Sequence, residues 1–368
     1  MDSHANPVTD IGLRPGTRYR HHRFSKDILT EIKSLKTDNW HGIVYIIKDY
    51  AVISVFIWLT LAVSYWFYPL AVLMIGAHQR GISTILHDSA HGVLARNRTL
   101  NFVLGTFPTA WAIFQRHFAY KQSHVLTHHP YLGRADKDPD LEFFIEEGVF
   151  TPRSDRAFVI HEIILPMFGS KTWAYLGYLV KNRWKLLIDR LRGIEAASEH
   201  QVQPPRTHQD ATRMKFDRIG FAVFWIAIIG LSLWQGWFIH LLLFWVVPYL
   251  TSFHILGWFI EMSEHCSCTE ERDVNVQMAR NRKSRHWEKW LTGINNDHYH
   301  LDHHLDPTTP FWRLPEAHAI RMRDVLYAAH DRETGGLFQT GPNGEPSIIS
   351  VLRTQNRARY QALAGPDG

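Results

Sequence analysis

Two long stretches of the chain are almost entirely apolar. The first covers residues 51–86 and is interrupted only near Arg80. A membrane-spanning helix needs about 20 apolar residues, so a stretch of about 36 residues is too long for one span and suits two. Pro69 lies where a turn between the two spans is expected. The pattern therefore predicts a helical hairpin over about 50–67 and 70–87.

The second apolar stretch repeats this arrangement. Ile219–Leu233 is apolar, Trp234–Trp237 forms a short polar break, and Phe238–Ile260 is apolar again. We predict a second hairpin over about 219–262. A soluble all-α protein with buried helices is the alternative, but apolar runs of this length favour an integral membrane protein.

Positive charge is distributed unevenly around these stretches. The two expected turns carry no Lys or Arg, whereas the polar segments between and beyond the hairpins carry many. The positive-inside rule then places these polar segments in the cytoplasm. The predicted organisation is an N-terminal cytosolic segment, a membrane domain with its cytosolic cap, and a cytosolic tail: 1–49, 50–318 (hairpins about 50–87 and 219–262, cap from 88–218 and 263–318) and 319–368.

The net charge of +5 fits either this topology or a contact with anionic membrane lipid. The sequence contains no recognisable nucleic-acid motif, so we expect no nucleic-acid partner. Only two cysteines are present, Cys266 and Cys268, which excludes a disulfide framework and a cysteine-rich metal site.

Histidine is unusually frequent, with 24 residues, and eight of these fall in three short clusters. Residues at i, i+3 and i+4 share one face of a helix, so each cluster presents imidazoles to one side. Neutral imidazole is the commonest metal ligand in proteins. The clusters, the first of which directly follows an apolar stretch, consist of His87 and His91; His124, His128 and His129; and His300, His303 and His304.

His265, at the end of the last apolar stretch, is a plausible ninth ligand. A zinc site takes about four protein ligands or fewer, so nine are too many for one ion and natural for two. No HExxH motif and no GxGxxG motif are present, which argues against a zinc protease and against a built-in nicotinamide or flavin domain. Asn296, one turn before His300, can hold a metal-bound water.

The clusters HDSAHG, HVLTHH and NNDHYHLDHHLDP resemble the three histidine boxes of the membrane-bound fatty acid desaturase and hydroxylase family, over residues 50–318. The resemblance implies an all-α integral membrane fold in which four transmembrane helices lie under a cytosolic helical cap. It also implies a di-iron centre that uses O2 and two electrons per turnover, with no separate protein acid or base assigned. Carried over by position, the iron ligands are His87, His91, His124, His128, His129, His265, His300, His303 and His304, with Asn296 acting through water.

The first box is compact, as in the bacterial branch of the family, which implies a multi-pass protein of the inner membrane with its active site on the cytoplasmic side. Gln79-Arg80, the segment from Gly133 to Leu141 and Glu264-His265 are similar to a subgroup that desaturates dihydrorhizobitoxine, giving the enol-ether amino acid rhizobitoxine. No cytochrome b5-like HPGG segment is fused to the chain. The resemblance therefore implies an external electron donor, a ferredoxin or another carrier with its reductase.

Three other functions remain open from the sequence. A fatty acyl chain of a lipid can replace the amino acid as substrate, and a hydroxylase or other monooxygenase can use the same scaffold. A metal transporter or sensor is the alternative from another class. Transporters place ionisable residues near the bilayer midplane, whereas these histidine clusters lie beyond the apolar stretches.

Overall fold

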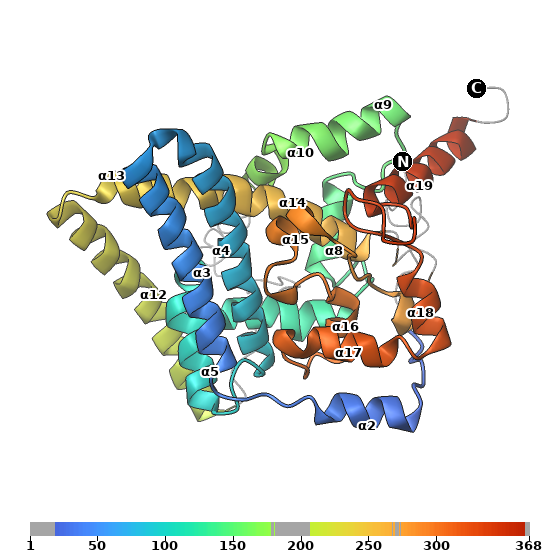
Figure 1. Cartoon of the computed structure of the whole chain (residues 1–368), viewed down its shortest axis with the longest axis horizontal. Helices are drawn as coiled ribbons and strands as arrows, with labels where there is room; N and C mark the ends of the chain where they lie inside the picture. The colour runs from blue at the N-terminus through green and yellow to red at the C-terminus, as the bar shows by residue number, and fades with distance from the viewer. Residues whose placement is uncertain are drawn as a thin grey trace, which may run out of the picture.

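The computed structural model of the protein describes residues 19–177, 180, 207–266, 268, 272 and 274–364. These residues form helices and loops, and the only β-type pairing among them is an isolated bridge between Arg20 and Val274. Long helices gather on one side of the molecule and the short helices of the C-terminal third on the other (Figure 1). The parts of the predicted cytosolic segments within 1–18, 181–206 and 365–368 lie outside the described residues.

The first hairpin consists of α3 (His41–Trp58), continued by the π-turn η1 (Leu59–Val63), and α4 (Tyr68–His91). The turn between them is at 64–67, slightly earlier than the sequence predicts. Ser64 leaves the helix with φ −166° and its hydroxyl accepts a hydrogen bond from the amide of Trp66. Pro69 lies in the first turn of α4, where a residue without an amide proton is tolerated.

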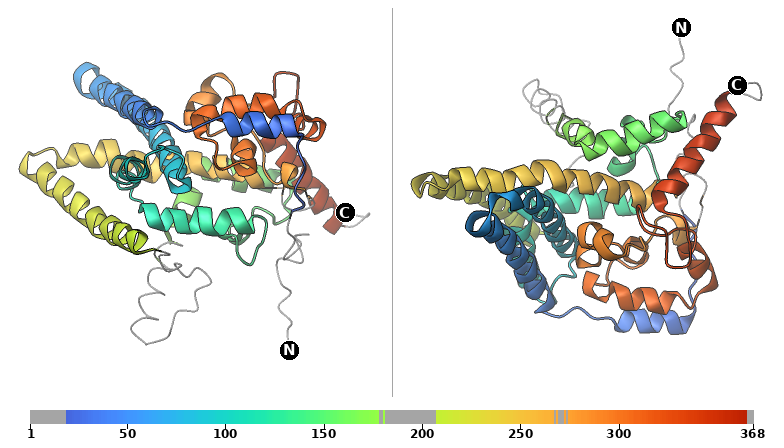
Figure 2. Two further views of the ribbon diagram at one scale, coloured as in Figure 1. Left: turned by 90° about the horizontal axis from the view of Figure 1, so that it is seen from below. Right: turned by 45° about the horizontal axis from the view of Figure 1, so that its top comes forward.

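The second hairpin turns where the sequence predicts. α12 (His208–Trp234) ends at a tight turn in which Gly236 has φ +75°. One rod then runs through α13 (Phe238–Leu241), η6 (Leu242–Val246), η7 (Tyr249–Phe253) and α14 (His254–His265). Figure 2 shows α12 at the edge of the molecule, and many of its apolar side chains, including Val223, Ile226 and Leu233, are exposed.

Three helices among the described residues are long and apolar enough to cross a membrane: His41–Val63, His208–Trp234 and Phe238–His265. α4 has 24 residues, but its second half carries polar side chains and is largely buried. It packs beside α3 and ends abruptly after His91, because Gly92 adopts φ +82° and terminates the helix. The first histidine box therefore occupies the last turn of α4.

The remaining helices lie around the long ones, and all of them are short except α19, which has 17 residues. They are α2 (Lys26–Ser34), α5 (Arg98–Gly105), η3 (Thr106–Ala110), α6 (His117–Tyr120), η4 (Lys121–His128), α7 (His129–Tyr131), α8 (Pro139–Glu146), α9 (Asp155–Phe158), η5 (Val159–Ile164), α10 (Leu165–Met167), η8 (Asn275–Gln277), α15 (His286–Thr292), η9 (Ile294–Asn296), α16 (His300–Leu305), η10 (Phe311–Arg313), α17 (Leu314–Arg321), α18 (Val325–Asp331) and α19 (Ile348–Ala364).

Apolar clusters hold these elements together on both sides of the histidines. One cluster joins α3, α4 and the rod through Ile53, Ile75, Ile82, Phe244 and Phe253. The other joins α8, α14 and the C-terminal segment through side chains that include Leu141, Phe144, Trp258, Met262, Leu337 and Ile348. Outside the apolar helices, burying a side chain such as Leu337 or Ile348 away from water contributes about 1.5–3 kcal/mol. The histidine-bearing helix ends are thus fixed between two apolar cores.

Polar contacts between segments distant in sequence also hold the helices together. Asp155, in the first turn of α9, pairs with Arg353 and Arg357 of α19. The turn before the third histidine box docks on the first hairpin, where the side-chain amide of Asn295 donates to Asp49 at 2.7 Å and to the Gly81 carbonyl at 2.9 Å.

Candidate metal centre

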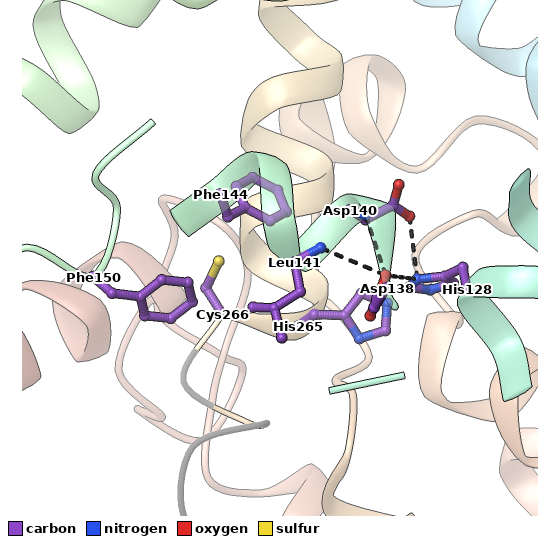
Figure 3. Close-up of a pocket in the computed structure, with 8 residues that line it drawn as sticks. All are labelled: His128, Asp138, Asp140, Leu141, Phe144, Phe150, His265 and Cys266. Carbon is purple, nitrogen blue, oxygen red and sulfur yellow. Dashed lines mark hydrogen bonds and ion pairs between the residues drawn. The ribbon is translucent and has the colours of Figure 1, made fainter. Parts of the chain in front are cut away.

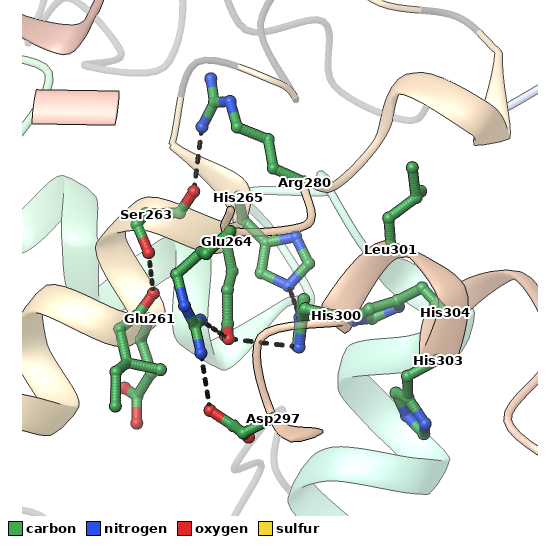
Figure 4. A network of polar contacts seen from close by, with 12 residues as sticks. Glu261, Ser263, Glu264, His265, Arg280, Asp297, His300, Leu301, His303 and His304 are labelled. Carbon is green, nitrogen blue, oxygen red and sulfur yellow. Dashed lines mark hydrogen bonds and ion pairs between the residues drawn. The ribbon is translucent and has the colours of Figure 1, made fainter. Parts of the chain in front are cut away.

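Nine histidines from four segments converge at the junction between the long and the short helices. The segments are the end of α4, the π-turn η4 with the start of α7, the end of α14, and α16. Figure 4 shows the side chains that α14 and α16 contribute. The converging residues are His87, His91, His124, His128, His129, His265, His300, His303 and His304.

Five of these imidazoles form one group. His87, His91, His124, His129 and His303 each offer a ring nitrogen, and these atoms all lie within 4.8 Å of one another. The Nε2 atom of His129 is 3.2 Å from that of His124 and 3.1 Å from that of His303. The Nε2 atom of His91 is buried and has no hydrogen-bond partner among the described residues.

The other four form a second group. Ring nitrogens of His128, His265 and His304 also lie within 4.8 Å of one another. The Nε2 atom of His300 is 2.8 Å from that of His265 and 3.0 Å from that of His304, so His300 joins this group. All nine predicted histidines are thus brought together, five in one group and four in the other.

The second histidine cluster contributes to both groups. His124 and His128 lie on η4, a π-helical segment with i→i+5 hydrogen bonds, and His129 begins α7. His124 and His129 belong to the five-histidine group, and His128 belongs to the four-histidine group. The rings of His124 and His128 still stack on each other, with their centroids 5.1 Å apart. The sequence predicts the cluster, and the surrounding helices decide which group each histidine joins.

Hydrogen bonds at Nδ1 orient two imidazoles of the four-histidine group. Nδ1 of His128 is 2.9 Å from Asp138, which is almost fully buried, and Nδ1 of His265 is 3.3 Å from the Met278 carbonyl. An imidazole that donates its Nδ1 proton keeps a free lone pair on Nε2, the form that binds a metal. Two imidazoles in this form have no proton on Nε2, so their Nε2 atoms cannot hydrogen-bond to each other. The short distances between Nε2 atoms therefore fit a cation bound between them.

A buried ion-pair network supports His300 in the same way. Its Nδ1 atom is 3.4 Å from Glu264, which in turn pairs with Arg282. Arg282 is fully buried and also pairs with Asp297 at 2.8 Å. Figure 4 shows Glu264, Asp297 and His300 in this network. In the five-histidine group, Nδ1 of His87 lies 3.4 Å from Asp88.

Burial sets the protonation state of the site. It lowers the pKa of most of the imidazoles outside the long helices well below the ordinary value of 6.5, and neighbouring imidazoles lower the pKa further; these residues are His124, His129, His300, His303 and His304. Neutral imidazoles are the form that binds metals. Burial alone would also lower the pKa of His128, but the carboxylates of Asp138 and Asp140 raise it to about 9. The same carboxylates favour a metal cation beside His128.

The donor set fits a metal centre of nitrogen ligands. A small pocket opens beside the four-histidine group, with His128, Asp138, Asp140 and His265 at its polar end. Figure 3 shows that Leu141, Phe144, Phe150 and Cys266 line its apolar end.

Two polar residues near the third histidine box bind other parts of the protein. Asp302 accepts hydrogen bonds from Arg321 and Tyr327, each at 2.6 Å, and thereby anchors α16. Asn296 donates to the Phe311 carbonyl at 3.2 Å. Asp138 was not singled out as a partner of His128; its place before Pro139, as the N-cap of α8, is the available sequence signal.

The geometry describes a buried, histidine-rich site at the end of apolar helices. Residues 63–334 match the fatty acid desaturase family, and the chain belongs to that family. It is therefore an oxidoreductase, a desaturase, which favours the enzyme over the transporter or sensor. This confirms the family predicted from the three histidine boxes.

A similar protein is dihydrorhizobitoxine desaturase of Bradyrhizobium elkanii. It is 46% identical over 349 residues, which cover 95% of this chain and 94% of the relative. The subgroup resemblance of Gln79-Arg80 and the Gly133–Leu141 segment is thus borne out along almost the whole chain.

Proposed function

We propose that the nine histidines hold two iron ions and that the enzyme introduces a C=C bond into the aliphatic part of an amino acid, dihydrorhizobitoxine. The convergence of nine buried or half-buried imidazoles in groups of five and four is the observation that carries the metal assignment. Imidazole suits iron as well as zinc, but zinc has no redox chemistry and would not serve a desaturase.

Iron with O2 supplies the strong oxidant needed to remove hydrogen from an unactivated methylene, which side chains alone do not provide. In the net reaction the substrate loses two hydrogen atoms, and O2 takes up these atoms with two electrons and two protons to give two water molecules. Asp138, Glu264 and the Met278 carbonyl hold their imidazoles in the ligating orientation. Asn296, fixed by its bond to Phe311, remains the proposed holder of a metal-bound water.

The electrons come from outside the chain in this proposal. A ferredoxin or a similar carrier with its reductase is the proposed donor, because no nicotinamide or flavin motif occurs in the sequence.

We further propose four spanning helices, with α4 as the fourth beside the three apolar ones. Its length of 24 residues and its packing beside α3 support this. The segments 1–49, 88–218, 263–318 and 319–368 are then cytosolic, which the distribution of Lys and Arg supports. The active site faces the cytoplasm at the bacterial inner membrane.

The substrate assignment is supported by the relative, whose name states that it desaturates dihydrorhizobitoxine. The test is expression with a ferredoxin–reductase pair in a host without desaturases. Offered dihydrorhizobitoxine, the enzyme should yield a product lighter by two hydrogen atoms, while host lipids stay unchanged. New lipid double bonds with untouched amino acid would contradict the substrate. A product heavier by one oxygen atom would show a hydroxylase.

A further inference from the structure

An ion pair joins two of the long helices close to the histidines. Nη1 of Arg80, on α4, is 3.1 Å from Glu261, on α14, and the guanidinium lies over the ring of Phe253 at 5.2 Å. Charged side chains within membrane-spanning helices are costly and usually functional. The Arg80 side chain is 18% exposed and that of Glu261 is 50% exposed, so the pair is reachable from outside.

The spacing of residues along α14 places this pair near the metal centre. Phe253, Gly257, Glu261 and His265 follow one another at intervals of four residues and share one face of the rod. At 1.5 Å per residue, Glu261 lies about 6 Å along the axis from His265. A side chain at Gly257 would place Cβ 3.0 Å from Nη1 of Arg80. Glycine therefore leaves the space in which the guanidinium rests against α14.

The facing surface of α4 has the same organisation. Arg80, Thr84, His87 and His91 are spaced by four, three and four residues and share one face. Arg80 lies about 10 Å along the axis from His87. Thr84, between them, contacts Asp297 at 3.3 Å. One charged pair thus lies between one and three helical turns from the proposed iron ligands, on the two helices that carry His87, His91 and His265.

We propose that Arg80 and Glu261 form the site that binds the amino-acid head of the substrate. Arg80 binds the α-carboxylate and Glu261 binds the α-ammonium group, an assignment that rests on the amino-acid desaturase function proposed above. The zwitterion replaces the internal ion pair, so each charge exchanges one opposite charge for another and none is buried unpaired.

The position of the pair selects the substrate class. A fatty acyl chain presents only methylenes at this depth and gains nothing from two charged side chains, which it would leave desolvated. An amino acid held here has its charged head about one helical turn from His265. The carbon atoms that reach the metal centre are then those a few bonds from the α-carbon. The pair therefore both binds the head of the substrate and determines which carbon atoms are desaturated.

The experiment compares steady-state kinetics of four proteins with the amino acid and with its methyl ester, which lacks the carboxylate charge. They are the wild type, Arg80→Met, Glu261→Gln and the charge-reversed double variant Arg80→Glu with Glu261→Arg. Losing one charge-assisted contact should raise KM for the amino acid roughly 10- to 100-fold. The methyl ester should already have a raised KM with the wild type, and Arg80→Met should raise it little further. Arg272→Met, which removes an exposed ion pair with Glu333 at 2.9 Å, is the matched control and should leave KM unchanged.

The double variant separates an anchor from a structural ion pair. It restores the attraction between α4 and α14, but it presents each end of the zwitterion to a like charge. Its thermal stability and iron content should match the wild type, while its KM stays high. A wild-type KM in the double variant, or in both single variants, would overturn the anchor while the amino-acid desaturase stands. A wild type that leaves the amino acid untouched and desaturates lipid would overturn both proposals, before any variant is tested.

Discussion

Replacing Asp138 with asparagine probes how the protein positions one metal ligand. The Asp138 carboxylate lies 2.9 Å from Nδ1 of His128 and accepts hydrogen bonds from the amides of Asp140 at 3.1 Å and Gly133 at 3.2 Å. Asparagine is isosteric and is a good helix N-cap, so α8 should still form. The substitution therefore removes the charge and one acceptor atom and little else.

The structure sets the size of the effect. The asparagine oxygen can keep the hydrogen bonds to Nδ1 of His128 and to the amide of Asp140. The side-chain NH2 group then faces the amide of Gly133, and two donors oppose each other. If the side chain flips, the NH2 group faces Nδ1 of His128 and disfavours the tautomer that leaves Nε2 free. A buried group left unpaired costs about 1–3 kcal/mol. Loss of such a support typically weakens metal affinity roughly 10- to 100-fold, or about 1.4–2.7 kcal/mol.

The assay is a chelator competition with the iron-loaded protein, followed by metal analysis. The chelator concentration that removes half of one iron equivalent should fall roughly 10- to 100-fold in Asp138→Asn. Asp136→Asn is the matched control, because Asp136 is in the same loop but is exposed and pairs with Arg134 at 2.9 Å rather than with a histidine. Unchanged iron retention in Asp138→Asn, or equal loss in both variants, would refute the role given to Asp138.

Three further outcomes are expected. His265→Ala should abolish activity and reduce iron from about two to about one per chain by metal analysis, because the five-histidine group stays intact, whereas His208→Ala should do neither. If His265→Ala kept full activity, His265 would not be the ninth metal ligand. Reporter fusions after Trp66 and after Trp234 should both read as non-cytoplasmic, and a cytoplasmic signal at both turns would contradict the two hairpins. Asp155→Asn should lower the melting temperature near neutral pH. Hydrogen bonds from two arginines of α19 hold the pKa of Asp155 below its ordinary 3.8, so its stabilisation is full above that value and is lost as pH falls further. The melting-temperature difference should therefore shrink in strongly acidic buffer, and a constant difference would contradict the ion pairs.

The sequence predicts features that depend on neighbouring residues. Apolar stretches of fixed length predict helices that can span a membrane, and the turn at Gln235-Gly236 follows from a polar break with glycine. The histidine boxes identify the family and predict the ligand set, because imidazoles at short intervals on a helix are suited to binding a metal. The first turn is the exception. Pro69 suggests a turn by itself, yet it is equally suited to the first turn of a helix, and Ser64 ends α3 instead.

Tertiary structure alone decides how distant residues combine. His128 and His129 are adjacent in sequence, and neighbouring residues of a helix point about 100° apart. Which histidines each of them meets depends on where α4, α14 and α16 place the other imidazoles. Local periodicity does not encode the docking of segments far apart in the chain. Arg80 and Glu261 are 181 residues apart, and each taken alone reads as an interface anchor. Only the packing of α4 against α14 brings the two charges together, because a contact between helices depends on their relative rotation and height, which neither helix's own sequence specifies.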